Sequence, residues 1–147
     1  MNYISIKNDN SIKGDDILFH VKIEKITPPS KGIPEALYHL CIINSNDQKW
    51  YKECTLKELY LFRNNIIFYF PSVCNLPFPL KSFWSYLPLI GHKYDERNWD
   101  VLLENKFILD DFFKSICNDK ELYKLTSFIK FFEAPHQRET FSSFNVV

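Results

Sequence analysis

Apolar and polar residues alternate in the first half of the chain, which predicts β-strands. From Ile17 to Ile26, apolar side chains occupy alternate positions, as expected for a half-buried strand. Ala36 to Asn44 is a second apolar run, and the turn-forming residues Asn44 to Gln48 lead into a third extended segment, Lys49 to Cys54. The pattern therefore predicts an antiparallel meander of three strands.

The spacing becomes helical directly after the third predicted strand. Thr55 and Glu58 form a capping-box pair in front of apolar residues at helical intervals. The following stretch, Phe70 to Leu80, is interrupted by prolines. Because proline excludes a regular helix or a central strand there, we expect an extended, partly polyproline-like crossing.

Two further helices are predicted in the last third of the chain. From about Asp100 to Ile116 the apolar residues form one stripe, with Asn105 in its middle. Asn118 and Glu121 form a second capping-box pair, and the apolar residues that follow at helical spacing predict the last helix.

The order of these elements predicts an α+β fold, in which a three-stranded antiparallel β-meander packs on a helical subdomain with a proline-rich loop. A length of 147 residues suits one domain. We expect a flexible N-terminal leader at 1–16, the domain at 17–133 and a loose C-terminal tail at 134–147.

Composition narrows the classes of function. The chain has 18 Lys+Arg and 18 Asp+Glu, a balance that argues against bulk attraction to nucleic acid. Its 3 glycines are too scattered to form a phosphate-binding loop or a dinucleotide fingerprint. The 4 cysteines lack zinc-site spacing, and we expect them to be buried thiols in a reducing compartment. No metal or cofactor is therefore expected.

Secretion and catalysis are not indicated by the sequence. The first residues lack the pattern of a secretory signal, which predicts a cytosolic protein. The 4 histidines are separated, and no serine lies in a nucleophile-elbow motif. We expect a protein that is not an enzyme.

A long uncharged stretch contains a single lysine. Between Asn64 and His92, Lys81 is the only charged residue, and many of its neighbours are aromatic or aliphatic. Lys81 is therefore the strongest candidate for binding a ligand. The competing interpretation is a lysine that caps a helix or extends its amine to solvent from an apolar loop.

Four segments, in this order, resemble motifs of the PX (phox-homology) domain, the phosphoinositide-binding module of the sorting nexins. Tyr51 to Leu56 stands at the position of the R-R-Y-S-D-F motif, and Leu76 to Lys81 resembles the proline-rich P-x-x-P-x-K loop. The spacing of residues 83–91 resembles that of the short PX-only sorting nexins, and Glu104 to Phe113 resembles the E-R-K-x-x-L-x-x-F helix. The resemblance covers roughly residues 17–133.

The resemblance implies a headgroup site built from Lys52, Lys81 and Asn105, with Lys106 as a neighbouring cation. Lys52 and Asn105 stand where the family has arginines, and Glu53 stands where it has a tyrosine that stacks on the inositol ring. A lysine keeps the charge but loses the bidentate guanidinium, and a carboxylate repels a polyanionic headgroup. For Asn105, the competing interpretation is a hydrogen bond to nearby backbone.

The resemblance further implies that Trp84, Leu89 and Ile90 insert into the membrane interface, whereas the competing interpretation places part of this cluster in the core. The implied function is a monomeric, phosphoinositide-binding membrane-targeting module of sorting-nexin type, with phosphatidylinositol 3-phosphate as its ligand. It would be cytoplasmic, peripheral on endosomal-type membranes, and have trafficking proteins among its partners. Glu53 and Asn105 support an alternative, a PX fold that has lost lipid binding and serves as a protein–protein interaction module.

Overall fold

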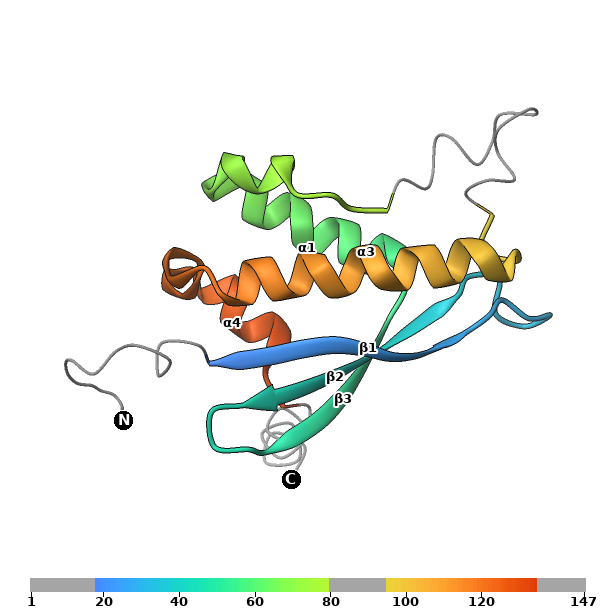
Figure 1. Cartoon of the computed structure of the whole chain (residues 1–147), viewed down its shortest axis with the longest axis horizontal. Coiled ribbons are helices and arrows are strands. Elements are labelled where there is room, and N and C mark those ends of the chain that lie inside the picture. Colours follow the sequence, from blue (N-terminus) through green and yellow to red (C-terminus); the bar gives the residue numbers. More distant parts are fainter. Residues whose placement is uncertain (1–17, 80–94, 135–147) are drawn as a thin grey trace, which may run out of the picture.

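The computed structural model describes residues 18–79 and 95–134, which form an α+β fold with one sheet and one helical layer. Figure 1 shows the helices packed over one face of the sheet. The strands lie in the order β1-β2-β3, and both neighbouring pairs are antiparallel. This arrangement confirms the predicted fold class. The strands are β1 (Phe19–Thr27), β2 (Leu37–Asn44) and β3 (Lys49–Cys54), and the helices are α1 (Leu56–Tyr69), η2 (Pro71–Asn75), α3 (Trp99–Cys117), η4 (Lys120–Lys124) and α4 (Thr126–Phe132).

The hairpin between β2 and β3 is held by the side chain of Asn44. Its Oδ1 accepts hydrogen bonds from the main-chain N–H groups of Asn46 and Gln48, both at 2.9 Å. Asp47 closes the turn with a φ of 64°, a left-handed conformation that Asp tolerates better than most residues. The register that follows pairs Leu40 with Lys52.

Helix α1 begins with the predicted capping box. The Thr55 hydroxyl accepts from the main-chain N–H of Glu58 at 3.2 Å, and the Glu58 carboxylate accepts from the N–H of Thr55 at 2.8 Å. Two amides at the start of the helix are thereby satisfied within the chain. The helix therefore starts immediately after β3.

The proline-rich stretch is only partly extended, which corrects the prediction. Pro71–Asn75 forms the short 3-10 helix η2, and the extended conformation begins at Leu76. Proline suits the first position of a helix because its missing N–H has no partner there in any case.

The predicted capping box of Asn118 and Glu121 is also wrong. Asn118 is the C-cap of α3, and Asp119 caps η4 by accepting from the N–H of Glu121 at 3.0 Å. Helix α4 starts only at Thr126, without a side-chain cap. Because Asp and Asn both favour caps, the sequence could not show which of two neighbours takes each role.

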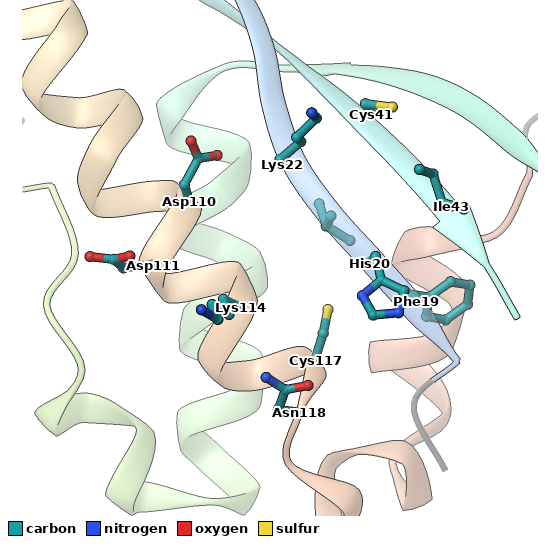
Figure 2. A pocket seen from close by; sticks show the side chains of 11 residues that line it. Phe19, His20, Lys22, Cys41, Ile43, Asp110, Asp111, Lys114, Cys117 and Asn118 are labelled. Atoms are coloured by element: carbon teal, nitrogen blue, oxygen red, sulfur yellow. The ribbon is translucent and has the colours of Figure 1, made fainter. Parts of the chain in front are cut away.

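The edge strand β1 is bound by side chains of the helical layer. The N–H of Ile23 donates to Oδ1 of Asp110 on α3 at 2.7 Å, and the N–H of Phe19 donates to the Tyr123 hydroxyl at 3.3 Å. Figure 2 shows Asp110 on α3 beside β1, at the border of a hollow of about 510 Å³ that Lys22 and Lys114 also line. Asp110 therefore has a structural role.

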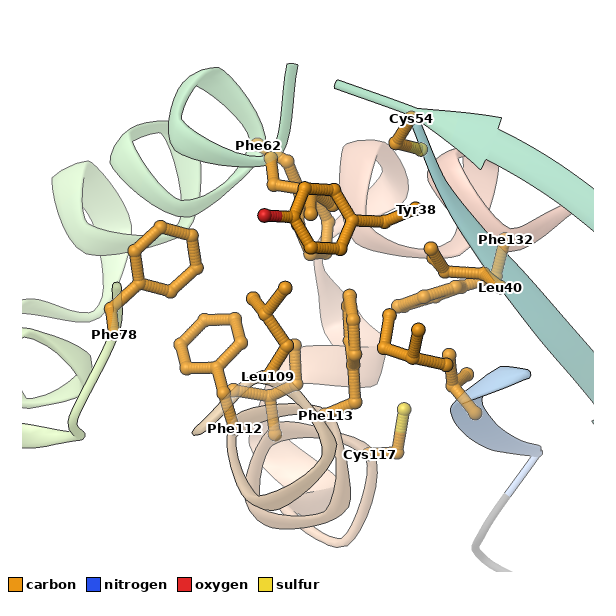
Figure 3. Close-up of a cluster of buried hydrophobic side chains, with 14 of the residues drawn as sticks. Tyr38, Leu40, Cys54, Phe62, Phe78, Leu109, Phe112, Phe113, Cys117 and Phe132 are labelled. Atoms are coloured by element: carbon orange, nitrogen blue, oxygen red, sulfur yellow. The ribbon is translucent and has the colours of Figure 1, made fainter. Parts of the chain in front are cut away.

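The core joins the inner face of the sheet to the helices. Its largest fully buried side chains include Tyr38, Phe112, Phe113, Phe128 and Phe132. Figure 3 shows Tyr38 and Phe132 entering this core from the sheet side and from α4, with Phe112 and Phe113 entering from α3. Aromatic rings thus pack between the two layers together with aliphatic side chains such as Leu40 and Leu109.

Three of the four cysteines are buried as predicted, and one is not. Cys41, Cys54 and Cys117 are buried, whereas Cys74 in η2 is exposed. All four thiols are free. Within the described ranges, no helix combines the length and apolar character needed to cross a membrane.

Candidate functional site

Lys52 lies on β3 and points into the helical layer. Its Nζ donates to the main-chain carbonyl of Phe131 on α4 at 2.7 Å and lies 3.7 Å from the centre of the Phe131 ring. Alternation along β3 causes this orientation, because Trp50, Lys52 and Cys54 share the inner side of the strand. Lys52, which the resemblance assigns to phosphate binding, is thus hydrogen-bonded to α4. It lines an open hollow of about 450 Å³ that α1 and α4 border.

Asn105 is buried in the centre of a polar cluster that links α3 to the sheet. Its Nδ2 donates to the Tyr38 hydroxyl at 3.0 Å, and that hydroxyl donates to Oε2 of Glu96 at 2.7 Å. The other carboxylate oxygen of Glu96 accepts from the N–H of Ala36 at 3.3 Å. Glu96 and Asn105 are each only 7% exposed. Asn105 therefore has a partner inside the fold, although not the backbone partner that the sequence suggested.

The Tyr38 hydroxyl stays protonated in this cluster. Burial raises the pKa of Tyr38 well above its usual range, and the Glu96 carboxylate raises it further. A protonated hydroxyl can donate to Glu96 while it accepts from Asn105. The buried carboxylate of Glu96 is therefore stabilised by hydrogen bonds from a side chain and from the main chain.

Lys106 lies on α3, one turn before Asp110. Its Nζ is 3.0 Å from Oδ2 of Asp110, the same carboxylate that accepts from the N–H of Ile23. The ammonium is also near the Phe107 ring, 5.9 Å from its centre. Lys106 thus supports the contact between α3 and β1.

Glu53 lies on the outer side of β3, opposite His39 in the register. Its carboxylate is 3.5 Å from Nδ1 of His39, whose Nε2 is 2.7 Å from the Thr27 hydroxyl. The Glu53 side chain is 60% exposed. It therefore points away from Lys52 and does not occupy the space around that amine.

The proline-rich segment is hydrogen-bonded to α1 at Pro79, two residues before Lys81 in the sequence. The Tyr60 hydroxyl donates to the carbonyl of Pro79 at 2.7 Å, and the rings of Tyr60 and Phe78 are 5.0 Å apart. Phe78 also contacts Phe112 and lies beneath the guanidinium of Arg63, which is 5.1 Å from the ring centre. Lys81 and the predicted insertion residues Trp84, Leu89 and Ile90 lie outside the described residues.

Two of these contacts join residues so far apart that no local sequence pattern indicates them. Tyr38 and Glu96 are 58 positions apart, and Lys52 and Phe131 are 79 apart. The sequence did single out Lys52 and Asn105 as unusual, but it did not indicate Glu96 or Tyr38. Among the described residues, no group of three or more His, Cys, Asp or Glu side chains could hold a metal ion.

The meander, the capped α1, the proline-rich crossing and the long α3 together define a PX-like fold. Among solved structures, the chain is similar to a designed CISK-PX domain determined by X-ray crystallography, with a TM-score of 0.60 and 15% sequence identity. The match covers 78% of this chain and 98% of that chain. No known family profile and no curated protein sequence matches the chain. The similarity at this level of identity is one of fold.

Proposed function

We propose that this chain is a phosphoinositide-binding, membrane-targeting module. The observation that supports the proposal is the PX-like fold. Lys52 precedes the Thr55 cap of α1 by three residues, and Tyr60 of α1 binds Pro79, just before Lys81 in the sequence.

The two lysines would neutralise the phosphates of the headgroup. An ammonium has three donors, so Lys52 can bind a phosphate oxygen while it keeps or exchanges its bond to the Phe131 carbonyl. Trp84, Leu89 and Ile90 would add apolar contact at the interface. Since the formal net charge is +0, this apolar contact must contribute much of the affinity.

We further propose phosphatidylinositol 3-phosphate as the ligand and endosomal-type membranes as the location. The protein would be a cytoplasmic, monomeric, non-enzymatic peripheral membrane protein of sorting-nexin type. Trafficking proteins would be its partners. These points rest on the sequence resemblance and on the PX-like fold.

The test is liposome co-sedimentation of the full chain across the phosphoinositides. Lys52→Ala and Lys81→Ala should each weaken binding by about tenfold or more, the effect of one lost charge-assisted hydrogen bond. Lys124→Ala is the matched control, because Lys124 is exposed and pairs with its neighbour Glu121, three residues away. Sedimentation with none of the lipids, or equal binding by all variants, would contradict the proposal.

A second candidate is a protein–protein interaction module on a PX fold that no longer binds lipid. The observation that favours it is that the fold itself uses several of the predicted headgroup donors. Asn105 bonds to Tyr38, Lys106 pairs with Asp110, and Glu58 places a carboxylate at the start of α1.

Restoring the family residues separates the two candidates. If the headgroup site still binds lipid, but weakly because Lys52 and Glu53 replace the residues of the family motif, the double variant Lys52→Arg, Glu53→Tyr should strengthen lipid binding by about tenfold. Circular dichroism should verify the fold of this variant, because Lys52 contacts Phe131 and Glu53 lies beside His39. No binding by the wild type and by this variant, with both folded, would support the interaction module.

A further inference from the structure

Three large apolar side chains form an exposed stripe along α3. Trp99 is 51% exposed, Leu103 39% and Phe107 67%. They are spaced four residues apart, so they lie next to one another on the helix surface and span about 12 Å of its length.

The stripe is separate from the side of α3 that builds the core. Leu102, Leu109 and Phe112 are fully or almost fully buried on that other side. Isolated exposed apolar residues are ordinary, but a row of three that includes a tryptophan marks an interaction surface more often than chance exposure.

An acidic row runs beside the stripe. Asp100, Glu104 and Asp111 are all exposed, and their spacing places them on the adjoining side of α3. None of the ion pairs among the described residues involves these three carboxylates. The face therefore combines an apolar centre with a border of three exposed carboxylates, and the exposed Lys114 lies one turn beyond Asp111.

We propose that this α3 face, made of Trp99, Leu103, Phe107, Asp100, Glu104 and Asp111, docks an amphipathic helix of a protein partner. The partner helix carries apolar residues along one side and Lys or Arg beside them. Side chains four apart form a ridge that fits between the ridges of a second helix. The carboxylate border then pairs with the partner's cations.

The negative border argues against two other occupants. Anionic lipid surfaces repel carboxylates, so this face is poorly suited to the membranes that a phosphoinositide-binding module would contact. A second copy of the same face would bring like charges together across a two-fold axis. The proposed face does not include Lys52 or the Tyr38 cluster, and its one link to the implied headgroup residues is Phe107, whose ring centre lies 5.9 Å from the Lys106 ammonium.

The test uses two synthetic helical peptides with the same leucine pattern, one flanked by lysines and the other by glutamates. Fluorescence anisotropy with the full chain should give at least about tenfold tighter binding of the lysine peptide. Phe107→Ser should weaken that binding by about tenfold or more, as expected for a central apolar contact. The double variant Glu104→Gln, Asp111→Asn should weaken it severalfold and reduce its dependence on salt.

Phe68→Ser is the matched control, because Phe68 is 78% exposed but lies on α1. It should leave peptide binding unchanged, and circular dichroism of every variant should show the wild-type fold. Equal affinity for the two peptides, no binding of either, or binding insensitive to Phe107→Ser would overturn the proposal.

Two parallel measurements distinguish the other occupants. A dimer in sedimentation velocity that Phe107→Ser dissociates would assign the face to a second copy. Binding to phosphatidylcholine/phosphatidylserine vesicles that Phe107→Ser abolishes would assign it to lipid. Either result would overturn the proposal of a basic helix.

Discussion

At the scale of single residues, Tyr38 contributes to stability through both its ring and its hydroxyl. Its ring lies in the core, while its hydroxyl joins Glu96 and Asn105. Water cannot easily replace the Tyr38 hydroxyl as the hydrogen-bond partner of Glu96 and Asn105, because each of these residues is only 7% exposed. The hydroxyl therefore matters for stability more than an average hydrogen bond would.

Tyr38→Phe should lower the free energy of unfolding by about 1 to 3 kcal/mol, because it leaves a carboxylate oxygen and an amide without their partner. Urea denaturation followed by circular dichroism at neutral pH measures this change. Tyr51→Phe is the control, since Tyr51 is 49% exposed on β3. Equal midpoints for the two variants would show that the cluster contributes nothing to stability.

The same hydroxyl predicts a loss of stability at high pH. The folded chain holds the pKa of Tyr38 well above its usual value of 10.0, so the unfolded chain releases this proton first. The contribution is fully present below about pH 10 and decreases as the pH rises above it. Denaturation from pH 8 to 11 should show a steeper decline for the wild type than for Tyr38→Phe. Parallel curves would contradict this assignment.

The cysteines should differ in reactivity. Burial raises the pKa of Cys54 and of Cys117 to about 12, and Cys41 is also buried, whereas Cys74 is exposed. Because the thiolate is the reactive form, Ellman's reagent at pH 8 should label Cys74 quickly in the native protein and the others only after unfolding. Cys74→Ser should remove the fast phase. A fast phase that survives this substitution would show that a buried thiol opens readily.

At the scale of elements, Asp110 fastens α3 to the edge of the sheet. One of its carboxylate oxygens accepts from the main chain of Ile23, and the other binds Lys106. The first bond joins two elements that are distant in sequence, whereas the second lies within one helix. Their contributions to stability should therefore be unequal.

Asp110→Ala should lower the free energy of unfolding by about 1.5 to 3 kcal/mol, since it leaves the Ile23 N–H without its charged acceptor. Lys106→Ala should cost only about 0.3 to 0.5 kcal/mol, the usual value of an ion pair four residues apart on a helix. Thermal and urea denaturation of both variants give the comparison. A larger effect of Lys106→Ala would mean that the ion pair, and not the bond to β1, is the important contact.

Elements with a strong local pattern were predictable from the sequence. Alternation located the three strands, and the pairing of Thr55 with Glu58 located the start of α1. Short 3-10 helices have no comparable pattern, so η2 and η4 were missed. The candidate site was predictable only as a set of unusual residues, because the partners of Lys52 and Asn105 come from distant parts of the chain.

At the scale of the whole molecule, one aromatic core connects the sheet and the helical layer. Phe132 of α4 contacts the rings of Phe19, Phe62 and Phe113, which belong to β1, α1 and α3. Its carbonyl also accepts from the Trp50 indole at 2.9 Å. Layers that share a single core are expected to unfold together.

Phe132→Ala should lower the free energy of unfolding by about 3 to 5 kcal/mol, because it leaves a large cavity in this core. Far-ultraviolet circular dichroism and tryptophan fluorescence should give coincident urea midpoints in the wild type. Phe68→Ala, at an exposed site, should change the free energy by less than about 0.5 kcal/mol. Separate midpoints for the two signals would show that sheet and helices unfold independently.

The side chains that bind the edge of β1 also protect the protein from self-assembly into fibres. An uncovered edge strand offers its amides to any other strand, and pairing of this kind starts cross-β aggregation. Asp110 and Tyr123 occupy the amides of Ile23 and Phe19, so an incoming strand finds two of the hydrogen-bond donors of β1 already used and meets a carboxylate. A protein that is concentrated on a membrane or in a complex gains from this protection, because crowding many copies together would otherwise favour edge-to-edge pairing.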